Sequence, residues 1–120
     1  MRTGIDIVQT ERISLEEKFL KKIANEDEIA YVRGYRDEDL QKQSFAGLWA
    51  VKEAVFKLLG LGKDSTVAFK NVVLFHEESG RPYVELNGIA LRTFKELKLK
   101  QIEVSISHEK GNVVAVAVAI

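Results

Sequence analysis

The sequence predicts an α+β fold in which an antiparallel sheet packs on one long helix. The first observation is that apolar residues recur every three or four positions from Leu40 to Leu59, which is the period of a helix. The second is that residues 102–107 alternate apolar with polar side chains, as in a strand with one buried face. The third is the predicted order of elements, strand, helices, hairpin, helix and hairpin, which is typical of α+β proteins.

Length and composition indicate one domain that spans residues 1–120. The chain has 120 residues, 46% of them hydrophobic, which suffices for one core but not for two. Lysine plus arginine total 18, as do aspartate plus glutamate, so neither nucleic acid nor a membrane surface is an expected partner. The absence of cysteine excludes disulfides, thiol nucleophiles and cysteine-ligated metals. No apolar run approaches the roughly 20 residues that span a bilayer, and the composition fits a cytoplasmic protein.

The first half of the chain predicts one strand followed by helices. Residues 4–8 form a short strand, and Ser14 with Glu17 forms a capping box for a first helix. A second amphipathic piece covers residues 29–32. The main helix begins at the acidic residues 37–39, which suit a helix N-terminus, and has about six turns at 3.6 residues per turn.

The second half predicts two hairpins with a helix between them. Residues 72–76 and 83–86 flank a turn-rich tip that contains Pro82, and Asn87 caps the following helix. The last hairpin ends in the apolar run from Val113 to Ile120. A strand this apolar needs cover on both faces, and other subunits could supply part of it.

Three charged residues stand out within apolar surroundings. Glu53 and Lys57 share one face of the main helix, and Asp6 lies in the first strand. The structural alternatives are a surface ion pair for Glu53 and Lys57 and a solvated residue at a frayed strand end for Asp6. The functional hypothesis is that Asp6 and Glu53 form a pair of hard oxygen ligands for magnesium, with Lys57 neutralising substrate phosphate.

Two other motifs fail as catalytic sites. Ser105, Ser107 and His108 lack an acid at the spacing of a serine-hydrolase triad. The loop from Gly60 to Ser65 lacks the spacing of a phosphate-binding loop and follows a helix rather than a strand.

Four segments together form a recognisable set: residues 4–8 with Arg12, residues 49–54 with Lys57, residues 79–83 and residues 105–108. Over the whole chain, this set resembles the small bacterial type of 4'-phosphopantetheinyl transferase, the holo-acyl-carrier-protein synthase family. The family transfers the phosphopantetheine arm of coenzyme A to a serine hydroxyl of apo acyl carrier protein. Adenosine 3',5'-bisphosphate is released, and magnesium is required.

The resemblance implies a role for individual residues. Asp6 and Glu53 would be metal ligands, and Lys57 would contact the coenzyme A phosphates. A metal-bound water or a carboxylate such as Glu53 would accept the proton from the attacking serine. His108 would lie near the nucleotide.

In one position the chain departs from the family pattern, which often has arginine where this chain has Leu48. The resemblance therefore implies that a phosphate contact is missing or is replaced by Lys52, Lys63 or Arg81.

The resemblance also implies a homotrimer with each site between two subunits. The acidic carrier protein would dock on a basic patch near the first helix, formed by Arg12, Lys18, Lys21 and Lys22. A second cluster, Lys95, Lys98 and Lys100, is the other candidate for the docking surface. Two alternative functions remain open: a non-catalytic oligomeric interaction module, and another magnesium-dependent phosphoryl enzyme such as a nucleotide pyrophosphatase.

Overall fold

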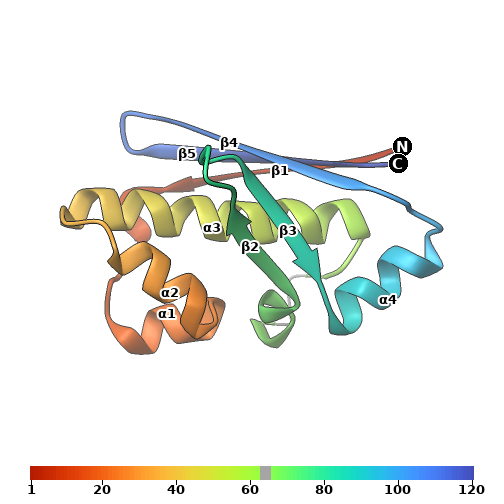
Figure 1. Cartoon of the computed structure of the whole chain (residues 1–120), viewed down its shortest axis with the longest axis horizontal. Coiled ribbons are helices and arrows are strands. Elements are labelled where there is room, and N and C mark those ends of the chain that lie inside the picture. Colours follow the sequence, from red (N-terminus) through yellow and green to blue (C-terminus); the bar gives the residue numbers. More distant parts are fainter. Residues whose placement is uncertain (63–65) are drawn as a thin grey trace.

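A three-stranded antiparallel sheet lies across one long helix, and the remaining helices and a two-stranded sheet pack on the other side of that helix (Figure 1). This computed structural model describes residues 1–62 and 66–120. In chain order the elements are β1 Arg2–Gln9, the 3-10 helix η1 Thr10–Arg12, α1 Glu17–Ile23, α2 Glu26–Arg33, α3 Glu38–Leu59, the 3-10 helix η2 Thr66–Asn71, β2 Val72–His76, β3 Pro82–Leu86, α4 Gly88–Glu96, β4 Ile102–Glu109 and β5 Asn112–Ala119. The predicted fold class is confirmed.

The long helix α3 has 22 residues and is defined at both ends by local chemistry. At its start the Asp37 side chain accepts a hydrogen bond from the Asp39 backbone N–H at 2.7 Å, as an N-cap residue does. At its end Gly60 adopts φ 73°, the left-handed conformation that glycine takes most readily. Between these caps the apolar residues of α3 form much of the core.

The three-stranded sheet has the order β1-β5-β4, so the last strand of the chain lies in its centre. Val113, Ala115 and Ala117 of β5 are buried, whereas Val114, Val116 and Val118 are only half-buried. Ile5 and Ile7, their neighbours on β1, are 59% and 61% exposed. One face of the sheet is thus covered by α3, and the other face is apolar and open within a single chain.

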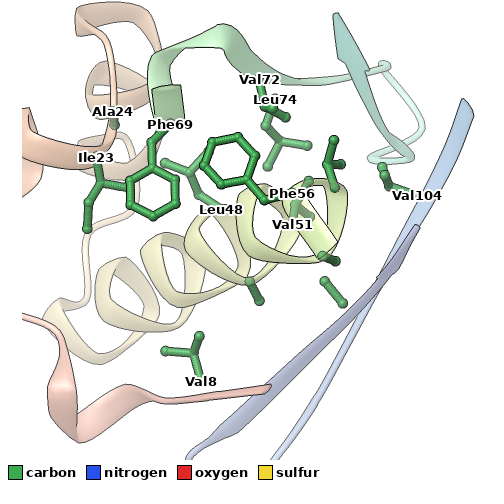
Figure 2. Packing of buried hydrophobic residues seen from close by; sticks show 14 of the residues in the cluster. Val8, Ile23, Ala24, Leu48, Val51, Phe56, Phe69, Val72, Leu74 and Val104 are labelled. Carbon is green, nitrogen blue, oxygen red and sulfur yellow. The ribbon is translucent and has the colours of Figure 1, made fainter. Parts of the chain in front are cut away.

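The core lies on both sides of α3 and also joins it to the η2 and β2 segments (Figure 2). Phe56 of α3 stacks on Phe69 of η2, with ring centroids 5.0 Å apart and planes 5° from parallel. Val8 lies on the opposite side of the helix, beneath the sheet. The helix is therefore enclosed, which explains why twelve of its 22 residues are buried.

Two predicted helix starts differ from the observed ones. The capping box of Ser14 and Glu17 is wrong, because Ser14 Oγ accepts from the Glu16 backbone N–H and α1 begins without a side-chain cap. The observed capping box belongs to α2, where Asn25 and Glu28 each accept the other's backbone N–H at 3.0 Å. Asn25 is therefore the N-cap of the second helix, which begins at Glu26 rather than near residue 29.

The α4 helix was predicted with the right position and the wrong cap. Asn87 occupies the N-cap, but its side chain accepts a hydrogen bond from Asn71 Nδ2 instead of capping the helix. The side chain of Asn71 in turn accepts the Ile89 backbone N–H at 3.1 Å. Gly88 has φ 53°, and a Cβ at that position would lie 2.6 Å from Asn71 Oδ1, so the tight turn requires glycine.

Candidate active site

Asp6 lies on the face of β1 that covers α3. It alternates with the exposed Ile5 and Ile7 and pairs with Ala115 of β5 in the ladder, so it is not at a frayed strand end. Lys57 Nζ lies 3.0 Å from Asp6 Oδ1 and donates a second hydrogen bond to the Ile5 carbonyl, also at 3.0 Å. The Asp6 side chain is 18% exposed and that of Lys57 46%, so an entering ligand can reach both.

A close backbone approach brings β1 this near to α3. A Cβ built on Gly4 would lie 1.9 Å from the Ala54 carbonyl oxygen and 2.9 Å from the Leu58 nitrogen. Only glycine allows the strand to lie so close to the helix. Asp6 is two residues further along the same face of the strand, and Glu53 and Lys57 lie next to Ala54 and Leu58 on the helix.

Glu53 is half-buried on α3, one helical turn before Lys57. The same face of the molecule therefore holds two carboxylates, Asp6 and Glu53, and one ammonium group. In residues 1–62 and 66–120 there is no group of three or more His, Cys, Asp or Glu side chains that could hold a metal ion. Two carboxylates suit magnesium, which is commonly bound by one or two carboxylates together with waters and substrate phosphates.

A cleft of about 290 Å³ lies elsewhere on the chain, where α2, α3, the β2–β3 hairpin and the β4–β5 hairpin meet. Its polar lining consists of side chains without a permanent charge, and its floor includes Gly47 of α3. The lining residues are Tyr31, Tyr35, Leu40, Gln43, Ser44, Gly47, Leu74, His76, Gly80, Pro82, Ile106, His108 and Val113.

Of the two predicted nucleotide contacts, one lines this cleft and the other does not. His108 lies at its edge on β4. Arg81 is instead hydrogen-bonded to Glu77 at 2.7 Å and to Glu103 at 2.5 Å. These two carboxylates, Glu77 first, raise the pKa of Arg81 above its ordinary value. Arg81 would have to leave both acids to reach a ligand in the cleft.

Neither Leu48 nor its proposed replacement Lys52 can supply a phosphate contact in this cleft. Leu48 is 3% exposed and lies under the cleft wall. Lys52 is completely buried and donates hydrogen bonds to Glu28 at 3.1 Å, to the Phe69 carbonyl at 2.8 Å and to the Val72 carbonyl, so it cannot contact a ligand. Lys63 lies outside the described residues. Burial lowers the pKa of Lys52, and the Glu28 charge opposes this shift.

Sequence reasoning missed the aromatic and buried polar residues of this region. Tyr31 lies in the predicted amphipathic piece 29–32 and His76 at the end of a predicted strand, and the sequence assigns no role to Tyr35. Burial lowers the pKa of His76, which favours its neutral form. Burial, followed by the hydrogen bond with Tyr35, raises the pKa of Tyr31 to about 12, so its hydroxyl keeps its proton. The sequence holds one signal for this region: the Asn25–Glu28 spacing resembles a capping box and so indicates the start of α2, the helix that carries Tyr31.

We call Asp6, Glu53 and Lys57 the charged group. This group and the cleft lie at opposite edges of the three-stranded sheet. Asp6 belongs to β1, at one edge, whereas His108 belongs to β4, at the other. Along α3, Gly47 in the cleft and Lys57 are ten residues apart, about 15 Å at 1.5 Å per residue. The two therefore do not form one pocket within a single chain.

The residues proposed to receive a carrier protein are exposed, but two of them already have partners. Arg12 lies over the Trp49 ring, 5.2 Å from its centroid, and Lys21 pairs with Glu17 at 3.2 Å. Lys18 and Lys22 are exposed on α1. Lys95, Lys98 and Lys100 are exposed at the other end of the molecule, on and after α4 (Figure 1).

Comparisons with known proteins agree with the fold. The family model of the 4'-phosphopantetheinyl transferase superfamily matches residues 2–118. The chain belongs to this superfamily, which confirms the resemblance inferred from its sequence. No helix in the described part of the chain is long and apolar enough to cross a membrane.

Within the superfamily, similar proteins include several holo-[acyl-carrier-protein] synthases. The enzyme of Alkaliphilus metalliredigens is 37% identical over 97% of this chain and 95% of its own length. The crystal structure from Neisseria meningitidis has a TM-score of 0.82 and 26% identity, covering 99% of this chain and 97% of its own. The structure from Helicobacter pylori, solved in complex with coenzyme A, has a TM-score of 0.81 and 28% identity and covers 98% and 99%.

Proposed function

We propose that this chain transfers the 4'-phosphopantetheine group of coenzyme A to a serine of apo acyl carrier protein, giving holo acyl carrier protein and adenosine 3',5'-bisphosphate. The similarity over almost the full chain to holo-[acyl-carrier-protein] synthases, one of them solved with coenzyme A, carries this conclusion. The exposed Asp6–Lys57 pair supports it, because a displacement at phosphorus needs cationic groups near the phosphate oxygens.

Asp6 and Glu53 hold magnesium in this proposal. Both offer hard carboxylate oxygens, and Asp6 is accessible at the sheet edge. When bound, the ion neutralises charge on the pyrophosphate of coenzyme A. Lys57, already positioned by Asp6 and the Ile5 carbonyl, adds a cation for the same phosphates.

The remaining chemistry is positioning and proton transfer. The hydroxyl of the carrier serine attacks the phosphorus nearest the pantetheine, and the bond from that phosphorus to the bridging oxygen breaks. Adenosine 3',5'-bisphosphate leaves with the electron pair of that bond. Glu53, on the same helix face as Lys57, accepts the proton of the serine hydroxyl.

Each complete site forms between two copies of the chain, and the assembly is a homotrimer. The cleft with His108 holds the nucleotide end of coenzyme A, and the charged group of a neighbouring copy holds the pyrophosphate. The separation of these two groups at opposite sheet edges supports this arrangement. The open apolar face with Ile5 and Ile7 gives the copies a surface to bury.

The acidic carrier docks on the basic patch of Arg12, Lys18, Lys21 and Lys22, all of which are exposed. The protein works in the cytoplasm, a location with which its lack of cysteine is compatible.

The direct test is the mass of apo acyl carrier protein after incubation with coenzyme A, magnesium and this protein. We expect the carrier to gain one phosphopantetheine group. Cleavage of coenzyme A with no gain of carrier mass would instead indicate a pyrophosphatase. No change in either molecule would indicate a non-catalytic interaction module.

A further inference from the structure

Two aromatic rings from different elements stack at the wall of the cleft. Tyr31 of α2 and His76 of β2 have centroids 4.2 Å apart and planes 2° from parallel. Tyr31 is 42% exposed, and Tyr35 meets it edge to face at 6.0 Å. All three residues line the cleft. A partly exposed aromatic surface of this kind in a cleft can receive another planar ring.

A buried ion pair holds the two elements that carry these rings. Glu28, one turn before Tyr31 on α2, accepts the Leu74 backbone N–H of β2 at 2.9 Å. Lys52 of α3 pairs with the same carboxylate at 3.0 Å and also donates to carbonyl groups of η2 and β2. The ammonium and the carboxylate are both satisfied by these contacts. Tyr31 and His76 are therefore held in place before any ligand arrives, which lowers the cost of binding.

The chemistry of the cleft favours a neutral heteroaromatic ring over a phosphate. Among its lining residues there is no lysine, arginine, aspartate or glutamate. Gln43 and Ser44 of α3 line the cleft and offer neutral donors and acceptors to the polar edge of a ligand. The nearest arginine in the β2–β3 turn, Arg81, is engaged by Glu77 and Glu103.

We propose that the Tyr31–His76 pair is the surface on which the purine base of coenzyme A stacks, and that Tyr31 determines the affinity for the nucleotide end of the donor. This inference rests on the proposed function, which brings coenzyme A to the protein, and adds the residues that recognise its base. The base extends the existing stack, while its polar edge meets the neutral side chains of α3.

Calorimetric titration with adenosine 3',5'-bisphosphate tests the inference on the assembled protein. We expect Tyr31→Ala to bind the bisphosphate about tenfold more weakly, as expected from the loss of one stacking contact. Tyr31→Phe keeps the ring and should bind within twofold of the wild type. The matched control is Tyr83→Ala, because Tyr83 stacks on Phe75 at 5.4 Å on the opposite face of the same hairpin.

Two further measurements separate stacking from a general loss of structure. The loss in Tyr31→Ala should vanish with ribose 3,5-bisphosphate, which has the phosphates but no base. In proton NMR spectra, the adenine resonances should move upfield on binding to the wild type and not on binding to Tyr31→Ala.

Several results would overturn the inference. Unchanged affinity of Tyr31→Ala for adenosine 3',5'-bisphosphate would do so, as would an equal loss with the base-free probe. The wild-type mass assay judges the proposed function separately. If the wild type modifies the carrier while Tyr31→Ala binds normally, the function stands and the stacking role fails. If the wild type neither modifies the carrier nor binds the bisphosphate, both fail.

Discussion

Lys57 Nζ and Asp6 Oδ1 lie 3.0 Å apart, although 51 positions separate the two residues in the chain. The contact joins α3 to the edge strand β1 and lies next to the Gly4–Ala54 approach. Because Asp6 and Glu53 belong to elements that pack within one chain, the proposed metal ligands come from a single subunit. Lys57 is thus held beside a carboxylate of the proposed metal site.

The first prediction concerns these ligands. Asp6→Asn and Glu53→Gln should each lower transfer by at least about a hundredfold, because each removes one anionic ligand from a site with few to spare. Both substitutions keep the shape of the side chain, so circular dichroism and the thermal midpoint should stay close to those of the wild type. The measurement is carrier mass against time over a magnesium titration.

Glu85→Gln, at an exposed acid on β3, is the matched control and should behave as wild type. Normal turnover in both site variants would remove Asp6 and Glu53 from the mechanism.

The second prediction concerns Lys57. Lys57→Met should lower kcat about a hundredfold and change the affinity for coenzyme A less, because the ammonium acts mainly on charge that develops in the transition state. Lys70→Met, at an exposed lysine on η2, is the control. Stopped assays with saturating carrier protein and varied coenzyme A give kcat and the KM for coenzyme A. A small, equal effect at both positions would indicate a surface ion pair instead.

The third prediction concerns the buried residue Lys52. Lys52→Met should lower the free energy of unfolding by about 3 to 5 kcal/mol, since it leaves the Glu28 carboxylate buried without its cation. Lys21→Met breaks only an exposed pair and should cost less than about 1 kcal/mol. Urea denaturation measures both.

Adding Glu28→Gln to Lys52→Met should cost less than the sum of the single changes, because the two side chains interact. Strict additivity would show that the ion pair contributes nothing.

The fourth prediction concerns the shared site. Ser44→Trp fills the cleft but keeps Asp6, whereas Asp6→Asn keeps the cleft. After subunit exchange, an equal mixture of these inactive variants should regain about a quarter of the wild-type activity, because one boundary site in four receives both intact parts. A mixture of Asp6→Asn and Glu53→Gln should regain none, since these residues belong to one chain. Light scattering should give the mass of a trimer. A monomeric mass would contradict the site shared between subunits.

The fifth prediction concerns the carrier. Reversing Lys18 and Lys22 to glutamate should raise the KM for acyl carrier protein and flatten its salt dependence, while coenzyme A binding is unchanged. Arg12 is left intact because its guanidinium lies over Trp49. Reversal of Lys95 and Lys98 is the control. If only the control raised KM, the docking surface would lie at α4.

The sequence allowed the elements and the charged group to be predicted, because both depend on local or strongly periodic signals. The period of α3 and the acidic residues at its start are examples. The burial of Lys52 was not predictable from the sequence. Lys52 and Glu53 are consecutive charged residues of α3, and the helical period does not show that the first is buried and the second only half-buried. The cleft was missed for a related reason: Tyr31 and His76 meet only after α2 and β2 pack together, and no sequence period reports that contact.

The pairing of the first strand with the last has a consequence for synthesis of the protein. Arg2 pairs with Ala119 and Gln9 with Asn112, so β1 has no partner in this sheet until residues 112–119 have been made. Throughout translation, Asp6 is attached to a strand whose neighbour does not yet exist, while α3 can already form from local contacts. A chain interrupted before residue 112 would thus have a complete α3 but would lack the strand β5 that pairs with β1 and places Asp6 beside Lys57.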